Sequence, residues 1–290
     1  MCPRDSLIRK LENMPFSVFE QIVAKTVAEI PQVNIITFSG FGEFSMDPNW
    51  KEKVKLASEF FPSIHVLTNL SQFTESDLFV LLDHVTTIRI SVYGLSAATY
   101  ARIHRHSANT HFDAINAHIE TLINHKQNHQ KIILNHIVLE ENRDELPGWI
   151  KQWEPKVDRI EVWEPHNWVD GKHYRERCAH TIKTCGRPFN GPIQVQVDGT
   201  LNVCCFDYNG KMIIGDLTSQ NYTEIFNGPE ISLIRELHRN GNADSLELCS
   251  ICDQRVCDTC KSAHMLYSSE MSPKQRVSVT STAFEILNRH

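Results

Sequence analysis

The sequence predicts an α/β fold, in which a parallel sheet with helical crossovers is followed by a smaller domain containing a β-hairpin. Strand-like apolar runs alternate with helical patterns through the first 170 residues, and strands separated by helices form parallel sheets. Beyond that point apolar residues alternate with polar ones over 193–203, and Asp198-Gly199 within this run is a strong hairpin turn. We expect the active groups at the carboxyl ends of the parallel strands.

Each element of the predicted sheet has its own local signal. Ser17 and Glu20 form a capping box for a helix whose apolar residues recur along one face up to Ile30. Asp47 and Pro48 supply the N-cap and first position of a helix that runs through Phe61. The predicted strands are Val33–Phe38, Ile64–Leu67, Thr87–Tyr93, Lys131–Leu139 and Arg159–Trp163. The other predicted helices are Glu75–Leu82, His111–His125, Arg143–Trp153 and, after the hairpin, Thr223–His238.

Composition limits the location and the partners of the chain. At 290 residues, with 41% apolar and 22% charged residues, the sequence suits a globular protein with one medium core and a smaller domain. The formal net charge of −6 offers no general basic surface, so we expect no nucleic-acid partner. The sequence contains no apolar run of about 18 residues and no signal-peptide pattern, so we expect no membrane partner and a cytoplasmic location.

The cysteines are unevenly distributed along the chain. Cys2 stands alone, and the other eight begin at Cys178 and include two C-x2-C pairs between residues 249 and 260. A disulfide framework is not expected in a reducing compartment, whereas soft thiolates at this spacing favour zinc or iron–sulfur clusters. The sequence therefore predicts a thiolate-bound metal site in the C-terminal region.

Three segments of the first half resemble a known family in their order and spacing. They are Met1-Cys2-Pro3, the loop Phe41-Gly42-Glu43 and the segment Ile88–Tyr100. Together they resemble the radical S-adenosylmethionine (SAM) enzymes, in which a C-x3-C-x2-C loop after the first strand holds a 4Fe-4S cluster. In that family a glycine-glycine-glutamate type loop after the second strand binds the SAM amino group. The resemblance implies a partial (β/α)6 TIM-like barrel, whose first strand we expect upstream of Met1.

The resemblance implies roles for residues of this barrel. Cys2 matches the third cysteine of the cluster loop as an iron ligand, and Gly42 with Glu43 matches the SAM-binding loop. Ser91 and Asn135, at the ends of later strands, are expected either to contact the SAM ribose or carboxylate or to line the barrel mouth. Because the first two cluster cysteines do not occur in the chain, we expect an internal methionine taken as the start, or a fragment.

The C-terminal region resembles the SPASM and twitch auxiliary-cluster domains. Thirteen residues separate Cys185 from Gly199 and four separate Gly199 from Cys204, as in the opening signature of those domains. The resemblance implies one auxiliary 4Fe-4S cluster, in a twitch-like arrangement, with the ligands Cys185, Cys204, Cys249 and Cys252.

Other cysteines leave alternatives open. Strand alternation places Cys204 and Cys205 on opposite faces, so one cluster takes only one of them, and we predict Cys204 as the ligand. Cys178, Cys257 and Cys260 either join a second metal site, bind zinc or remain free thiols. Iron and zinc both accept four thiolates, so the ligand count does not identify the metal.

The resemblance implies radical SAM catalysis, in which a 5′-deoxyadenosyl radical abstracts hydrogen from a small alcohol or sugar or from a peptide. An electron donor such as flavodoxin or ferredoxin is the implied partner. We expect a barrel over 1–170, the auxiliary-cluster domain over 171–270 and a tail over 271–290. The alternative is a zinc or iron–sulfur binding protein without SAM chemistry.

Overall fold

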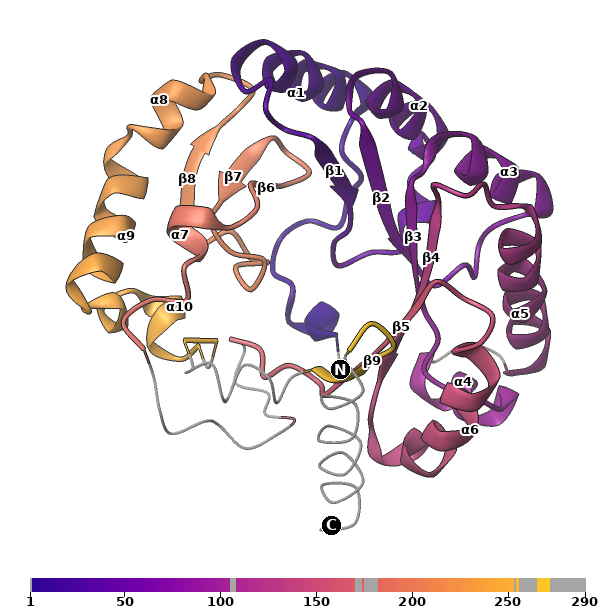
Figure 1. Cartoon of the computed structure of the whole chain (residues 1–290). Coiled ribbons are helices and arrows are strands. Elements are labelled where there is room, and N and C mark those ends of the chain that lie inside the picture. The colour runs from indigo at the N-terminus through magenta and orange to yellow at the C-terminus, as the bar shows by residue number, and fades with distance from the viewer. Residues whose placement is uncertain are drawn as a thin grey trace. The chain divides into compact units, whose positions relative to one another are not determined.

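The computed structural model describes residues 2–104, 108–169, 174, 182–252, 254–255 and 265–271, with backbone alone at 108–110. Two compact units make up the structure, and each combines two stretches of the chain (Figure 1). Unit 1 comprises residues 1–34 and 166–261, and unit 2 comprises residues 35–165 and 262–290. Helices and strands occur in both units, which confirms the predicted α/β fold class.

Unit 2 is built on an open sheet that, within the described residues, has six strands. The first five strands are parallel and lie side by side in chain order, and the sixth is antiparallel to the fifth. This parallel order is the arrangement of a partial barrel, as the sequence predicts. The strands are β1 (Ile35–Phe38), β2 (Ser63–Thr68), β3 (Thr87–Ser91), β4 (Lys131–Ile137), β5 (Arg159–Trp163) and β9 (Met265–Ser268).

Helices of unit 2 lie along one side of this sheet (Figure 1). The strands bury apolar side chains such as Ile88, Ile90 and Leu134 on one face. Because side chains alternate along a strand, Arg89, Ser91 and other polar residues share the opposite face. The helices are η2 (Phe44–Met46), α2 (Trp50–Phe60), α3 (Glu75–His84), α4 (Ala97–His104), α5 (Ala108–His125), η3 (Glu140–Glu145) and α6 (Leu146–Trp153).

Several predicted boundaries in unit 2 are wrong. The N-cap of α2 is Asn49 rather than Asp47, whose Oδ1 instead accepts the Asn49 backbone N–H at 2.9 Å. The helix predicted over Arg143–Trp153 is divided into η3 and α6, which has a proline in its first turn. Strand β9 and helix α4 were not predicted. The β9 strand is defined by pairing with β5, about 100 residues away, and no local pattern signals such a partner.

Unit 1 combines α1 with a three-stranded antiparallel sheet and the helices that follow it. Ile22 of α1 packs into one core with Leu201 and with Ile225, Ile231 and Ile234 from the later helices. The elements of this unit are η1 (Pro3–Ser6), α1 (Phe16–Glu29), α7 (Arg187–Asn190), β6 (Gln194–Val195), β7 (Thr200–Asn202), β8 (Ile213–Asp216), α8 (Tyr222–Phe226), α9 (Pro229–Asn240), η4 (Ala243–Ser245) and α10 (Glu247–Ser250).

Two helix predictions in unit 1 are corrected by the structure. Helix α1 begins at Phe16 with Pro15 at its N-cap and no side-chain cap, so the capping box predicted from Ser17 and Glu20 is wrong. Proline lacks an N–H and is favoured near a helix start, which moves the boundary toward the N-terminus. The helix predicted over Thr223–His238 is interrupted after α8, because Gly228 is extended and α9 begins at a proline.

The predicted hairpin is confirmed. Strands β6 and β7 pair antiparallel around Asp198-Gly199, and Gly199 has φ +88°, in the left-handed region that favours glycine. Strand β8, which was not predicted, adds to β7, and α8 and α9 run along the outside of this sheet (Figure 1). The turn residues therefore fix the register of the strand that leads to Cys204.

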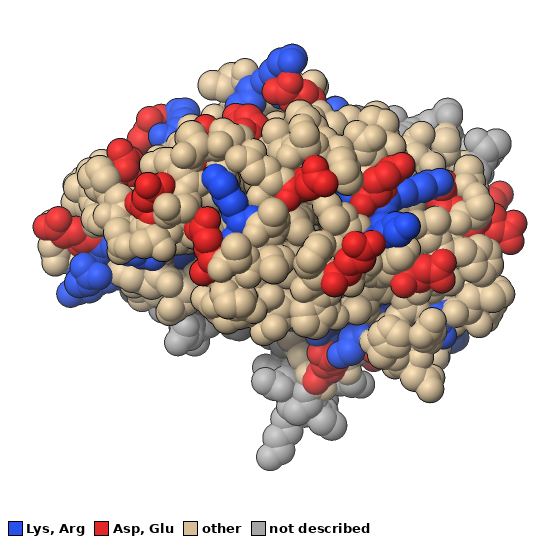
Figure 2. Space-filling view, turned by 90° about the horizontal axis from the view of Figure 1, so that it is seen from above, with Lys and Arg blue, Asp and Glu red and all other residues tan. Residues whose placement is uncertain are grey.

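The surface carries both charge signs. Figure 2 shows lysine and arginine side chains interspersed with aspartate and glutamate on the face seen from above. Among the helices of the described residues, none combines the length and the apolar character that crossing a bilayer requires.

Candidate metal centre and cofactor-binding residues

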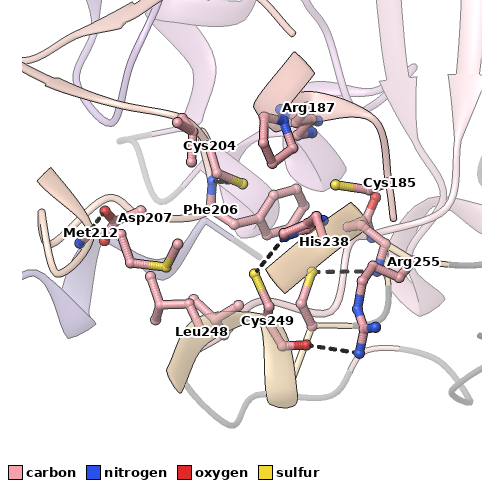
Figure 3. A pocket seen from close by; sticks show the side chains of 15 residues that line it. Cys185, Arg187, Cys204, Phe206, Asp207, Met212, His238, Leu248, Cys249 and Arg255 are labelled. Carbon is pink, nitrogen blue, oxygen red and sulfur yellow. Dashed lines mark hydrogen bonds between the residues drawn. The ribbon is translucent and has the colours of Figure 1, made fainter. Parts of the chain in front are cut away.

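Four cysteines of unit 1 line one pocket (Figure 3). Cys185 directly precedes α7, Cys204 follows β7, and Cys249 lies in α10 with Cys252 just beyond it. The sulfur atoms of Cys185, Cys204 and Cys249 point into the pocket in Figure 3. Three stretches of chain that are separate in sequence thus bring together the four thiols predicted as ligands.

The loop after Cys204 is held in place by Asp207. One oxygen of the Asp207 carboxylate accepts the Lys211 backbone N–H at 2.7 Å, and the other accepts that of Met212 at 2.8 Å. Asn202 donates from its side chain to the Asp207 carbonyl at 2.7 Å, which fixes the exit of β7. These contacts close a tight turn, so that Cys204 faces the pocket from a rigid backbone.

Polar hydrogens surround the pocket sulfurs. The Phe206 backbone N–H donates to Cys204 Sγ at 3.4 Å, and the Gln254 N–H donates to Cys252 Sγ at the same distance. His238 Nε2 lies 3.6 Å from Cys249 Sγ. Such contacts stabilise negative charge on sulfur, as a metal-bound thiolate requires.

Burial opposes ionisation of the metal-free thiols. It raises the pKa of Cys249 to about 12, with the nearby Cys252 as a second cause. The pKa of Cys204 is also raised, first by its hydrogen bond with Cys205 and then by burial. Metals bind the deprotonated thiolate, so loading this pocket releases protons.

Cys205 has a different environment from Cys204. It does not belong to the pocket lining, and Arg187 donates from Nη1 to its sulfur at 3.0 Å. The hydrogen bond from Cys204 lowers the pKa of Cys205, and the Arg187 charge acts in the same direction. Cys204 lines the pocket and Cys205 does not, but strand alternation is not the cause, because β7 ends at Asn202, before either cysteine. The role of Cys204 as a ligand stays a prediction.

The donor chemistry of the pocket fits an iron–sulfur group. Four thiols line the same pocket. Thiolates are the usual ligands of iron–sulfur clusters. The residues that would hold such a cluster are therefore Cys185, Cys204, Cys249 and Cys252.

The sequence also offers Cys2, Cys178, Cys257 and Cys260 as metal ligands. Cys2 is exposed in unit 1 and occupies the N-cap position of η1. Cys178, Cys257 and Cys260 lie outside the described residues. A second metal site, zinc binding and free thiols stay open as predictions for these three cysteines.

Glu43 of unit 2 is fixed by donors from the next strand and its own loop. The Asn69 backbone N–H donates to Oε2 at 2.8 Å, while the hydroxyls of Thr68 and Ser45 donate to Oε1. All these partners donate, which suits an ionised carboxylate. A Cβ added at Gly42 would meet no atom within 4 Å, so the backbone beside Glu43 is open to a ligand.

Ser91 and Asn135 are register partners on β3 and β4. They face the same side of the sheet near the carboxyl ends of their strands. Within the described part of the chain, the buried Oδ1 of Asn135 has no hydrogen-bond partner, which suits a ligand hydroxyl or N–H. Their assignment to SAM stays a prediction.

Further polar residues near these positions were not predicted from the sequence. Glu161, only 4% exposed, is the register partner of Asn135 and forms ion pairs with Arg89 at 2.7 Å and Arg159 at 3.0 Å. Tyr100 is buried, which raises its pKa, and the charge of Glu43 adds to this effect. Alternating polar residues inside apolar strands were the available signal for Arg89 and Glu161, whereas nothing local indicated Tyr100 or His238.

Comparison with known families identifies the C-terminal part of unit 1. Residues 185–253 match the SPASM family, described as an iron–sulfur cluster-binding domain. The match contains all four pocket cysteines and ends before Cys257. No curated protein matches the chain.

Solved structures resemble the chain as a whole. BtrN in complex with AdoMet and 2-DOIA is 16% identical, with 86% of this chain and 84% of BtrN covered at a TM-score of 0.51. The structure of anSMEcpe with bound AdoMet and the Kp18Cys peptide is 13% identical, with coverage of 96% and 91% and a TM-score of 0.59. SuiB from Streptococcus suis is 11% identical, with coverage of 79% and 63% and a TM-score of 0.60.

The open parallel sheet and these structural neighbours define a class: the chain has the fold of the radical SAM enzymes. Residues 185–253 match the SPASM family, and all four pocket cysteines lie within these residues.

Proposed function

We propose that this protein is a radical SAM enzyme whose SPASM domain holds an auxiliary 4Fe-4S cluster on Cys185, Cys204, Cys249 and Cys252. The observation that carries the proposal is the pocket itself, where these four thiols meet inside the matched iron–sulfur domain. With four protein ligands the cluster has no open iron, which favours electron transfer over direct substrate binding.

Glu43 is the residue proposed to bind the SAM amino group. Its carboxylate is oriented by Thr68, Ser45 and the Asn69 N–H, and the open backbone at Gly42 leaves room for the ligand. Asn135 and Ser91 are proposed contacts of the SAM ribose or carboxylate, and the buried Oδ1 of Asn135, which has no hydrogen-bond partner among the described residues, supports this role. A preoriented carboxylate binds an ammonium group without reorganisation.

When bound and reduced, the SAM cluster and SAM supply a 5′-deoxyadenosyl radical for hydrogen abstraction. Cys2 is proposed as one ligand of that cluster. The buried aliphatic residues of β3 and β4 exclude water from one side of the sheet, while polar residues on the other orient ligands.

The substrate is proposed to be a small alcohol or sugar, or a peptide. Structures of the same fold include one with the ligand 2-DOIA and one with a bound peptide, which supports both classes. A one-electron donor such as flavodoxin or ferredoxin is the proposed partner.

Metal content tests the auxiliary cluster. The full chain is reconstituted without oxygen, and iron, sulfide and zinc are counted for wild type, Cys204→Ser and Cys205→Ser. We expect about four irons in wild type and in Cys205→Ser, and loss of most iron in Cys204→Ser, since Cys204 lines the pocket and Cys205 does not. Equal loss in both variants, or zinc in place of iron, would contradict the cluster assignment.

SAM cleavage tests the catalytic part. Release of 5′-deoxyadenosine from SAM is measured after reduction, for the 290-residue chain and for the product of the reading frame extended upstream of Met1. We expect release from the form that contains three cysteines of the cluster loop. Absence of release from both forms, with the auxiliary cluster present, would support the alternative of a metal-binding protein without SAM chemistry.

A further inference from the structure

His238 is a buried histidine inside the SPASM domain. It lies on α9 at i+4 from Ile234 and i+7 from Ile231, and its exposed fraction is 1%. The apolar face of the helix therefore carries one imidazole into the lining of the cysteine pocket. The SPASM match covers this residue but assigns it no role.

Both ring nitrogens of His238 have partners. Nε2 lies 3.6 Å from Cys249 Sγ, and Nδ1 lies 2.9 Å from the hydroxyl of Thr184 (Figure 3 shows the contact with sulfur). That hydroxyl also accepts the Gly186 backbone N–H at 3.0 Å. A chain of contacts thus connects the backbone at Cys185 to the sulfur of Cys249.

A metal-bound thiolate at Cys249 would fix the proton positions in this series of hydrogen bonds. The thiolate has no proton, so a hydrogen bond with Nε2 requires that Nε2 carry the hydrogen. In a neutral ring with Nε2–H, Nδ1 is the acceptor, and the Thr184 hydroxyl becomes its donor.

We propose that His238 donates a hydrogen bond from Nε2 to the Cys249 sulfur of the auxiliary cluster, that Thr184 holds the required tautomer, and that this pair raises the cluster's reduction potential. The inference rests on the proposed auxiliary cluster, but not on SAM cleavage. His238 is a positioning and tuning residue in this account, because it touches a ligand and not the substrate.

The direction of the effect follows from charge. One-electron reduction adds a negative charge to the cluster, and a donor to a ligating sulfur stabilises the reduced form more than the oxidised one. His238 is buried and Cys249 is half-buried, so this hydrogen bond is stronger than it would be in water. The electron comes from the external donor, and His238 keeps its proton in both states.

The test is a reductive titration of the reconstituted full chain with dithionite and mediators, followed by the EPR signal of the auxiliary cluster. His238→Leu removes the donor, and His238→Gln replaces it with an amide N–H. Thr184→Val removes the hydroxyl that orients the ring, and Thr184→Ser retains it.

We expect His238→Leu to lower the equilibrium constant for reduction about tenfold, a shift of about 59 mV to more negative potential for one electron. Thr184→Val is expected to shift the potential in the same direction, while His238→Gln and Thr184→Ser remain near wild type. Iron counts are made first, so that potentials are compared only between fully loaded proteins.

Unchanged potentials in loaded His238→Leu and Thr184→Val would overturn the inference. If His238→Leu fails to take up iron, the comparison of Thr184→Val with Thr184→Ser decides in its place. A shift in potential without any release of 5′-deoxyadenosine would refute only the catalytic proposal, whereas zinc in the wild-type pocket would overturn both the cluster and this inference.

Discussion

Glu43 shows how one side chain is prepared for a ligand. Its two oxygens receive hydrogen bonds from a strand end, a backbone N–H and its own loop, so the carboxylate has one defined orientation. Such a group binds a ligand cation more strongly than an exposed glutamate does, because no ordering cost remains at binding. The neighbouring Gly42 leaves the approach open.

Glu43→Gln is expected to weaken the binding of SAM. The substitution removes the negative charge that is proposed to bind the SAM ammonium, so we expect the Kd for SAM to rise about 10- to 100-fold. Isothermal titration calorimetry on anaerobically reconstituted protein measures the change. Glu59→Gln, on the exposed side of α2, is the matched control. Equal Kd values for the two variants would remove Glu43 from the proposed site.

His136 is a second residue whose surroundings change its chemistry, because burial lowers its pKa. It is fully buried on β4, Nδ1 contacts the Val92 carbonyl at 3.1 Å, and the ring packs against Trp149. Burial lowers its pKa to about 4, well below the usual value near 6.5. The unfolded chain therefore binds a proton between these pH values that the folded chain does not bind.

This difference predicts a pH dependence of stability. Because the unfolded state takes up the proton, the free energy of unfolding falls as the pH decreases from about 6.5 toward 4. We expect His136 to account for a loss of about 2 kcal/mol between pH 7.5 and pH 5. Urea unfolding at both pH values should show a smaller loss in His136→Asn than in wild type or in the exposed control His129→Asn. An identical loss in all three proteins would show that His136 does not titrate on unfolding.

At the scale of elements, the β6–β7 hairpin determines where Cys204 lies. Its turn requires the positive φ of Gly199, and the exit of β7 is held by Asn202 and Asp207. The break between α8 and α9 has a similar consequence for His238. Because α9 starts at Pro229, its buried face is set by Ile231 and Ile234, and His238 follows on that face.

The prediction at this scale is that Gly199→Ala destabilises unit 1. A Cβ at this position would lie 2.6 Å from Cγ2 of Thr218, in a backbone conformation that side chains rarely adopt. We expect a loss of about 1–3 kcal/mol in the free energy of unfolding, measured with urea. Gly40→Ala, where a Cβ meets nothing within 4 Å, is the control and should change stability by less. A Gly199 variant as stable as the control would mean that the turn relaxes.

At the scale of the whole molecule, the path of the chain is the main feature. Each compact unit is formed from two separate stretches, and α1 shares a core with residues almost 200 positions later. The pocket likewise brings together four cysteines from three stretches of unit 1. A group bound there links segments whose closure is entropically costly in the unfolded chain.

Loading the cluster should therefore stabilise the SPASM domain locally. Binding to the folded state alone raises the free energy of unfolding, and the three ligand segments become ordered together. We expect hydrogen exchange followed by mass spectrometry to slow around residues 185, 204 and 249–252 after reconstitution, with β1 to β5 as the internal reference. Uniform slowing over the chain, or none at these segments, would contradict cluster binding in this pocket.

Features that depend on neighbours along the chain could be predicted without a structure. Strand β5 has the predicted bounds, and the Asp198-Gly199 turn forms the predicted hairpin. Cys249 and Cys252, which the C-x2-C spacing pairs, line the same pocket. Periodicity and turn chemistry act over a few residues, so they are legible without a structure. The roles of the ligands remain predictions, although four of them meet in one pocket.

Contacts between residues far apart in the sequence could not be predicted from local patterns and are seen only in the folded chain. The pairing of β9 with β5, the packing of Ile22 against Leu201, and the approach of His238 to Cys249 carry no local signal. Many partners satisfy the same apolar face or the same polar atom, and the choice among them depends on how the whole core buries its surface. For this reason the sequence predicted which cysteines line a metal pocket, while the folded chain showed which other residues surround them.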